Sequence, residues 1–190
     1  TKSIKSIFDP SYNNKQDLFG NPLVSFAYER GWREGFRAAG FPGADQEFYL
    51  ATGFFGKLPT IVDMSCGSGL FTRRFNRSNL YDRVIGADFS DSMLRETRRR
   101  LKAEQVLTPT TRKRNLACFD EDDPSAALNG LDLLRCDVAN IPMFSNSVDG
   151  VHAAAALHCW PSPVDGIREI HRVLKPGGKF FASTFLAAYW

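Results

Sequence analysis

The chain has 190 residues, a formal net charge of +3 and 43% hydrophobic residues. This composition suits one globular domain with a full hydrophobic core and excludes a disordered chain. The charge is too small to indicate a nucleic-acid or membrane partner, and no apolar run approaches the length of a membrane-spanning helix. The four cysteines lie far apart without metal-ligand spacing, so we expect reduced thiols and no metal site.

Residues 1–57 are expected to form an N-terminal arm and a helical lid, and residues 58–190 a ligand-binding core. Residues 1–21 are polar with scattered apolar positions, which is typical of an arm. Helical periodicity predicts one helix from Pro22 to Gly40 and a second over residues 44–55. Four side chains of the second helix are expected to face inward: Phe48, Leu50, Ala51 and Phe54. The aromatic side chains of this region belong to the core or, alternatively, to a lid formed by Tyr12, Tyr28, Arg30 and Trp32.

Residues 60–71, in the order TIVDMSCGSGLF, combine a short apolar run, a glycine-rich turn and a helical pattern. The β-branched pair Ile61 and Val62 predicts the end of a buried parallel strand, and apolar residues recur at helical spacing after the turn. Gly67 and Gly69 lack a Cβ, so a ligand can approach the backbone beside the free N–H groups of the following helix. The alternative is a turn that only connects the strand to the helix.

A second short strand, from Val84 to Ala87, ends in Asp88. This acid follows the glycine turn by about 20 residues, the spacing at which a carboxylate accepts hydrogen bonds from ribose hydroxyls in doubly wound sheets. Both strands would end on one edge of the sheet, beside the turn. A role for Asp88 as a cap of the next helix is the alternative.

Basic side chains gather downstream of the glycine turn. Arg73, Arg74 and Arg77 are expected on the solvated face of a helix over residues 68–76, and a helix over residues 90–103 carries further cations. A nucleic-acid surface requires cations interleaved with aromatic residues, which are missing here. We therefore favour a solvated helix face, with a phosphate-bearing partner as the alternative.

The rest of the chain continues the alternation of strands and helices after a poorly defined connection over residues 104–130. Strands are predicted over residues 131–135, 150–156 and 179–184, and a helix over residues 161–174. Such alternation predicts a parallel sheet with helices on both faces and ligands bound at the carboxyl ends of the strands. The residues expected on that edge are Asp63, Ser65, Asp88, Asp137 and residues 155–160.

Two classes of ligand suit such an edge. A dinucleotide needs the pattern Gly-x-Gly-x-x-Gly, whereas Thr72 stands at the third glycine position here. S-adenosylmethionine carries no phosphate and needs room for its methionine portion, a carboxylate for the ribose and a polar group for the adenine amine. The sequence therefore favours S-adenosylmethionine over a dinucleotide.

Four segments resemble the motifs of class I S-adenosylmethionine-dependent methyltransferases: residues 62–69, 86–93, 136–142 and 169–178. The resemblance covers roughly residues 58–185 and is strongest to the methyltransferase-11 or ubiquinone/menaquinone type. Residues 28–33, 41–43 and 156–163 are similar to a plastid-targeted branch of plants and algae. The resemblance implies an α/β fold with a doubly wound, Rossmann-like parallel sheet in strand order 3-2-1-4-5.

The sheet edge and the resemblance together indicate a set of cofactor-binding residues for S-adenosylmethionine. They are Asp63, Ser65, Cys66, Gly67, Gly69, Asp88, Phe89, Met93, Asp137, Val138 and Ala155 of the core, with Tyr28 and Arg30 of the lid. Ser65 replaces the usual first glycine of the family, which restricts the backbone but adds a hydroxyl for the cofactor's carboxylate. The family also continues past the fifth strand to an antiparallel pair, which we expect to be absent here because the chain ends at Trp190.

Methyl transfer from a sulfonium is an in-line displacement, so the protein must mainly align the reactants and exclude water. His158 is expected on the carboxyl edge and is the candidate base for a phenol or an activated carbon, with a structural role as the alternative. We expect an enzyme that acts on a quinone, phenol or lipid-like molecule, in the plastid by resemblance and otherwise in the cytoplasm. The alternatives are a non-catalytic binding or assembly protein and, less favoured, an RNA methyltransferase. Peripheral membrane association and the oligomeric state are left open.

Overall fold

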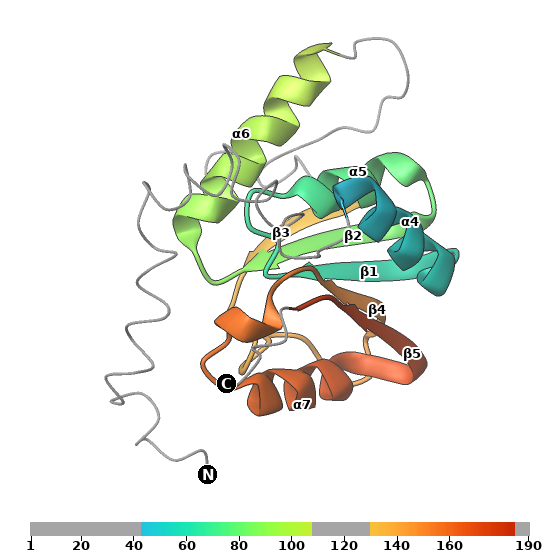
Figure 1. The fold of residues 1–190 in the computed structure, drawn as a ribbon, viewed down its shortest axis with the longest axis vertical. Helices are drawn as coiled ribbons and strands as arrows, with labels where there is room; N and C mark the ends of the chain where they lie inside the picture. Colours follow the sequence, from blue (N-terminus) through green and yellow to red (C-terminus); the bar gives the residue numbers. More distant parts are fainter. Residues whose placement is uncertain (1–42, 108–129, 185–190) are drawn as a thin grey trace.

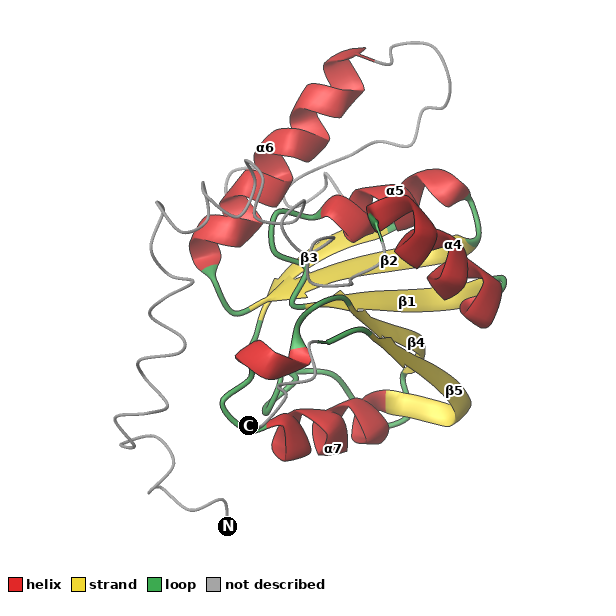
Figure 2. Cartoon of the chain, viewed as in Figure 1, coloured by secondary structure: helices red, strands yellow, loops and turns green. Residues whose placement is uncertain are grey.

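Helices cover both faces of one sheet in a computed structural model that describes residues 43–107 and 130–184 (Figure 1). In chain order, the elements are α4 (Ala44–Phe55), β1 (Leu58–Met64), α5 (Leu70–Ser78), β2 (Tyr81–Asp88), α6 (Asp91–Leu107), β3 (Leu131–Arg135), β4 (Val148–Ala153), η3 (Leu157–Cys159), α7 (Pro163–Val173) and β5 (Leu174–Ala182). Figure 2 shows the helices in red and the strands in yellow. The predicted α/β class is confirmed.

The strands of the described residues form one parallel sheet in the order β3-β2-β1-β4-β5. In the middle of the sheet, Val62 of β1 lies beside Ile85 of β2 and Val151 of β4. Because the strands are parallel, their carboxyl ends meet at one edge, toward the left of Figure 1. The predicted strand order is confirmed, and it reverses between β1 and β4, which is where ligands bind in doubly wound sheets.

Two hydrophobic clusters hold the helices against the sheet. Ala51 of α4, Phe75 of α5 and Leu101 of α6 belong to the cluster on one face. Ile170 of α7 packs with Val62 in the cluster on the other face. The central strands therefore bury side chains on both faces, which explains their continuous apolar sequence.

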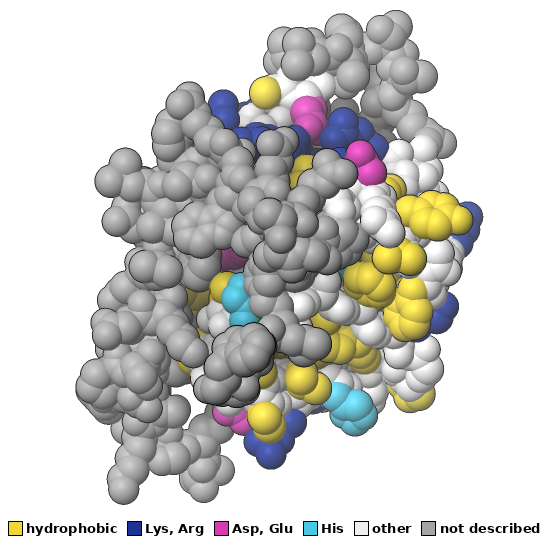
Figure 3. Space-filling model, in the orientation of Figure 1, with side chains coloured by type: hydrophobic (Ala, Val, Ile, Leu, Met, Phe, Trp, Pro, Cys, Tyr) yellow, Lys and Arg dark blue, Asp and Glu magenta, His cyan; other side chains and the backbone are white. Residues whose placement is uncertain are grey.

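Helix α4 presents a different face to the sheet from the predicted one. Glu47, Ala51 and Phe55 are buried at a spacing of four residues. Leu50 and Phe54, which were expected inside, are 48% and 47% exposed, so that part of the prediction is wrong. The helix holds more apolar residues than one face can accommodate, and hydrophobic side chains consequently gather on its outer side (Figure 3).

Arg73 lies inside the domain although we expected it on a solvated helix face. It is buried, its Nε donates to the carbonyl of Gly69 at 3.1 Å, and its guanidinium forms an ion pair with Glu104 of α6. The prediction is wrong for this arginine because Glu104 of α6 reaches it and neutralises its charge inside the domain. Arg77 is exposed, as expected, and reaches the same Glu104 at 3.4 Å.

Three of the five cations of α6 pair with acids of the same helix. Arg95 pairs with Asp91, and both Arg99 and Arg100 pair with Glu96. Pairs three or four residues apart are typical of a solvent-facing helix. They also reduce the positive field that a nucleic acid would require.

The second half of the sheet has different boundaries from the predicted ones. β4 ends at Ala153 instead of residue 156, because Ala155 adopts a left-handed φ of 48° and residues 157–159 form the short helix η3. β5 begins at Leu174, and residues 175–178 bulge out between the paired positions Leu174 and Lys179. His158 therefore lies in η3, beyond the end of β4.

Candidate functional site

The carboxylate of Asp88 is the centre of the polar contacts at the carboxyl edge. Its Oδ2 accepts the N–H of Gly67 at 2.8 Å, and its Oδ1 accepts the N–H of Ser90 at 2.8 Å. Asp88 therefore bridges the glycine turn after β1 and the start of α6. The backbone of Phe89 also hydrogen-bonds this carboxylate. Because a carboxylate offers about four lone-pair sites, acceptor capacity remains for a ligand hydroxyl.

The charge around Asp88 favours a cationic ligand. Burial raises the pKa of Asp88 to about 6, the charge of Asp63 adds to the increase, and the hydrogen bonds from Ser90 and Gly67 oppose it. Burial also raises the pKa of the Cys66 thiol well above its usual value, with the charges of Asp88 and Asp63 adding to the effect. A cation would relieve this repulsion, whereas a pyrophosphate would increase it. The site therefore suits the sulfonium and ammonium groups of S-adenosylmethionine.

The carboxylate of Asp63 turns into the interior of the domain. The residue is 1% exposed, its Oδ2 accepts the hydroxyl of Thr72 at 2.6 Å, and its Oδ1 lies 2.9 Å from Nδ1 of His152. The rings of Phe71 and Phe75 pack against this imidazole. Asp63 thus acts on the edge through its charge, while both of its oxygens are engaged inside the fold. Thr72 stands where a dinucleotide site would have its third glycine, and its hydroxyl donates a hydrogen bond to this carboxylate.

The turn between β1 and α5 runs through three residues with positive φ. The angles are 59° at Ser65, 56° at Gly67 and 75° at Gly69. The N–H of Cys66 donates to the carbonyl of Ala87, near the end of β2, at 3.0 Å. The hydroxyl of Thr97 donates to the carbonyl of Gly67 at 2.8 Å. The turn is therefore fixed from both β2 and α6.

We expect Gly69→Ala to destabilise the domain by about 3–4 kcal/mol, because it combines a left-handed backbone with overpacking. A Cβ at Gly69, where φ is 75°, would lie 2.4 Å from Cγ2 of Thr97. Gly177→Ala is the matched control, since φ is 79° there and nothing lies within 4 Å of its Cβ position. This control should cost only about 1–2 kcal/mol. Urea unfolding followed by circular dichroism measures both, and equal losses would contradict tight packing of Thr97 on the turn.

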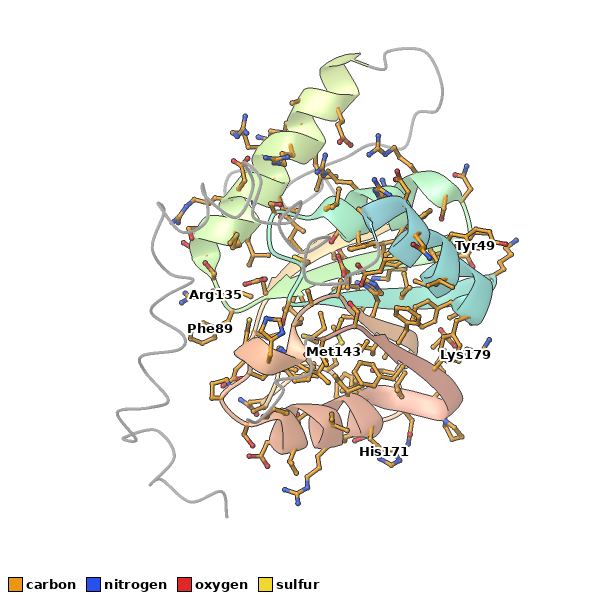
Figure 4. All side chains as sticks on the ribbon, in the orientation of Figure 1. Tyr49, Phe89, Arg135, Met143, His171 and Lys179 are labelled. Carbon is orange, nitrogen blue, oxygen red and sulfur yellow. The ribbon has the colours of Figure 1, made fainter. Side chains whose placement is uncertain are left out.

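Other residues of the expected cofactor-binding set lie around the ends of β2 and β3. Oδ1 of Asp137 accepts the N–H of Ala139 at 2.9 Å, which closes a tight turn. Phe89 is 42% exposed, and Nε of Arg135 donates to its carbonyl at 3.2 Å. Figure 4 shows Phe89 and Arg135 together at the carboxyl edge of the sheet. Two further expected residues, Met93 and Val138, are buried and support this part of the edge by packing.

The segment after β4, residues 154–160, is hydrogen-bonded to the residue that follows β5, which in turn contacts α4. The N–H of Ala155 donates to Oγ of Ser183 at 2.9 Å. The hydroxyl of Ser183 in turn donates to the buried carboxylate of Glu47 in α4. Ala155 is thereby held in its left-handed conformation at the edge of the sheet.

Two further contacts hold η3 and the residue that follows it. Nδ1 of His158 lies 3.2 Å from Oγ1 of Thr184, and burial lowers the pKa of this imidazole. The indole N–H of Trp160 donates to Oγ of Ser65 at 3.0 Å. The candidate base therefore lies on a segment that is hydrogen-bonded directly to the glycine turn.

A protein-family model described as a methyltransferase domain matches residues 62–182. The chain belongs to the methyltransferase domain family. An uncharacterized chloroplastic methyltransferase of Arabidopsis thaliana is 46% identical over 172 residues, which cover 90% of this chain and 44% of that protein. A demethylmenaquinone methyltransferase of Desulfitobacterium hafniense is 28% identical over 159 residues, covering 83% of this chain and 49% of that protein. The chain thus spans about half the length of these two relatives.

The fold of the methyltransferase domain also resembles solved structures. A crystal structure of a SAM-dependent methyltransferase from Aquifex aeolicus has a TM-score of 0.51 and 17% identity, and covers 68% of this chain and 58% of that one. At this identity the likeness concerns the fold alone. It agrees with the α/β class and the strand order.

The structure of this methyltransferase domain adds residues that sequence reasoning missed. Thr97 and Glu47 bind partners that are remote in sequence. Trp160 was expected on the edge within residues 155–160, but its hydrogen bond to Ser65 was not. A polar residue inside an apolar helical pattern is the only signal that marks Thr97 and Glu47 in the sequence. Two residues of the predicted lid, Tyr28 and Arg30, lie outside the described residues, as do Tyr12 and Trp32.

Residues 43–107 and 130–184 of the methyltransferase domain contain neither a metal-ligand cluster nor a membrane-spanning helix. No group of three or more His, Cys, Asp or Glu side chains in these ranges is arranged to hold a metal ion. The helices found there are too short or too polar to cross a bilayer. Burial, together with the charges of Asp88 and Asp137, raises the pKa of Cys136 to about 12, so this cysteine stays a neutral thiol.

Proposed function

We propose that the chain binds S-adenosylmethionine at the carboxyl ends of β1, β2 and β3 and transfers its methyl group to a small molecule. The observation that carries this proposal is the carboxylate of Asp88, which backbone N–H groups of the glycine turn and of the start of α6 hold at the carboxyl edge with acceptor capacity remaining. The negative surroundings of this carboxylate favour a cation. Membership of the methyltransferase domain family supports the same ligand.

Each part of the ligand has a candidate partner in this proposal. Asp88 accepts the ribose hydroxyls, Ser65 and Gly67 meet the methionine portion, and Asp137 and Phe89 border the adenine. The other proposed contacts come from Cys66, Gly69, Met93, Val138 and Ala155, and Asp63 contributes its charge. Tyr28 and Arg30 are proposed to close over the ligand as part of the N-terminal lid.

His158 is the proposed base. When bound, the cofactor supplies a methyl group on a sulfonium; the protein must orient the acceptor and take its proton. Because burial lowers the pKa of His158, its imidazole is mostly neutral at pH 7 and able to accept a proton from a phenolic hydroxyl. Thr184 orients the ring through its contact with Nδ1.

For the acceptor we propose a quinone, a phenol or another lipid-like ring, with the plastid as the location. The support comes from relatives: one is named as a demethylmenaquinone methyltransferase and another as chloroplastic. The paired cations of α6 give no comparable support for RNA.

Isothermal titration calorimetry of the full chain tests the cofactor assignment. We expect S-adenosylmethionine and S-adenosylhomocysteine to bind one per chain with a Kd of about 1–100 μM. NAD, which carries a pyrophosphate, should give no heat. Absence of binding by both adenosyl ligands would overturn the proposal. Mass spectrometry after incubation with reduced demethylquinones and simple phenols then identifies the acceptor class.

A further inference from the structure

The hydrogen bond between Trp160 and Ser65 joins two segments of the candidate site that have different proposed roles. Ser65 belongs to the cofactor turn after β1, and Trp160 ends the segment that carries His158. The indole is 4% exposed, and its ring packs so closely on α7 that a Cβ at Gly166 would lie 2.9 Å from Cε3 of Trp160. The position of the indole N–H is therefore set by the core and not by Ser65.

This contact fixes the role of the Ser65 hydroxyl. A tryptophan N–H can only donate, so Oγ of Ser65 is the acceptor at 3.0 Å. The hydrogen of the hydroxyl must then point to another acceptor. The contacts within the described residues supply none, and Ser65 is only half-buried, so the donor is available at the carboxyl edge.

The strained backbone conformation of Ser65 indicates that its hydroxyl has a function. The residue has a φ of 59°, a left-handed conformation that glycine adopts freely and that costs other residues free energy. Glycine at this position would remove that cost but would also remove the hydroxyl. The strained serine is thus explained by what its hydroxyl binds.

We propose that Trp160 is a positioning residue that holds the Ser65 hydroxyl as a hydrogen-bond donor to the carboxylate of the cofactor's amino-acid portion. The inference rests on the proposed function, because it assumes that S-adenosylmethionine lies at the turn. It also links the two halves of the site, since the same contact ties the segment of His158 to the cofactor turn.

A double-mutant cycle with two ligands tests this proposal. Trp160→Phe keeps an aromatic ring but removes the N–H, and Ser65→Gly removes the hydroxyl together with the backbone strain. S-adenosylhomocysteine contains the amino-acid carboxylate, whereas 5′-methylthioadenosine lacks the whole amino-acid portion. Calorimetry of both ligands therefore separates loss of this hydrogen bond from general damage to the site.

We expect Ser65→Gly to weaken S-adenosylhomocysteine binding by about 10- to 30-fold, as for a hydrogen bond to a charged group, and Trp160→Phe by about 3- to 10-fold. The double variant should bind like Ser65→Gly alone, because the two residues act through one hydroxyl. Binding of 5′-methylthioadenosine should change by less than about twofold.

Additive losses in the double variant, or equal losses for both ligands, would overturn the role of Trp160. If the unmodified chain binds neither ligand, it is the proposed function that fails. A nuclear magnetic resonance measurement needs no substitution at Trp160: its indole N–H signal is assigned by elimination with Trp32→Phe and Trp190→Phe. S-adenosylhomocysteine should shift this signal and 5′-methylthioadenosine should leave it in place; equal shifts would contradict the proposal.

Discussion

Asp88→Ala should weaken S-adenosylhomocysteine binding by about 100-fold or more, because hydrogen bonds to a charged group contribute about 1.5–3 kcal/mol each. The substitution removes the proposed acceptor for two ribose hydroxyls. It also removes the acceptor for the N–H groups of Gly67 and Ser90, which shape the turn. Calorimetry at pH 8 measures the loss, and circular dichroism checks that the variant folds.

Asp132→Ala is the matched control for this change in charge. Asp132 lies on β3, and its carboxylate pairs with Arg83 at 2.6 Å on the surface. Its removal should leave the affinity within about twofold, since exposed ion pairs contribute little. A similar affinity for Asp88→Ala and Asp132→Ala would show that Asp88 does not hold the ligand.

The pKa of Asp88, about 6, gives the same prediction a pH dependence. The usual value for the carboxyl is 3.8, so the folded, ligand-free protein holds this proton more tightly than the unfolded chain does. The cost of burying the ionised carboxylate is therefore present above pH 6 and disappears as the pH falls toward 4. Ligand binding runs in the opposite direction, because ribose hydroxyls need the ionised acceptor. The affinity should be constant above pH 7 and fall by about tenfold per pH unit below 6, and Asp88→Ala should lack this decline.

Local sequence patterns were sufficient to locate the turn and Asp88. Gly67 and Asp88 are 21 residues apart, and the strand, turn and helix between them form one continuous unit. The backbone conformation also follows locally, since Gly67 and Gly69 adopt positive φ as their lack of a Cβ allows. The carboxyl end of β2 could therefore be predicted to lie beside the turn without knowledge of the rest of the fold.

Contacts between distant segments could not be predicted in this way. Trp160 and Ser65 are 95 residues apart, and the pair Asp63 and His152 is separated by 89. Whether a strand-end acid faces the edge or the interior depends on its neighbours: His152 on β4 lies beside Asp63 and draws its carboxylate inward. Arg73 is buried for a similar reason, since Glu104 of α6 neutralises it.

His158→Gln should lower kcat by about 100- to 1,000-fold with a phenolic acceptor, the usual contribution of a general base. The change keeps a polar side chain of similar length but removes the titratable nitrogen. Binding of S-adenosylhomocysteine should stay within about twofold, because His158 lies in η3, where its imidazole meets the hydroxyl of Thr184 just after β5. In the unmodified chain, the rate should fall as the pH drops below the usual histidine range, since burial lowers the pKa of this imidazole.

His171→Gln is the matched control, because this histidine is exposed on α7, away from the carboxyl edge (Figure 4). Its kcat and its pH profile should equal those of the unmodified chain. A small effect of His158→Gln on kcat, with the acid limb of the profile intact, would assign proton transfer to another group. An acceptor that is already ionised at pH 7 would remove the need for a base, so the effect of His158→Gln should shrink as the pKa of the phenol is lowered. The ratio of kcat between the unmodified chain and His158→Gln should therefore be measured for phenols of different acidity. If His158 removes the proton, the ratio falls as the phenol becomes more acidic. If His158 only positions the acceptor, the ratio is the same for every phenol.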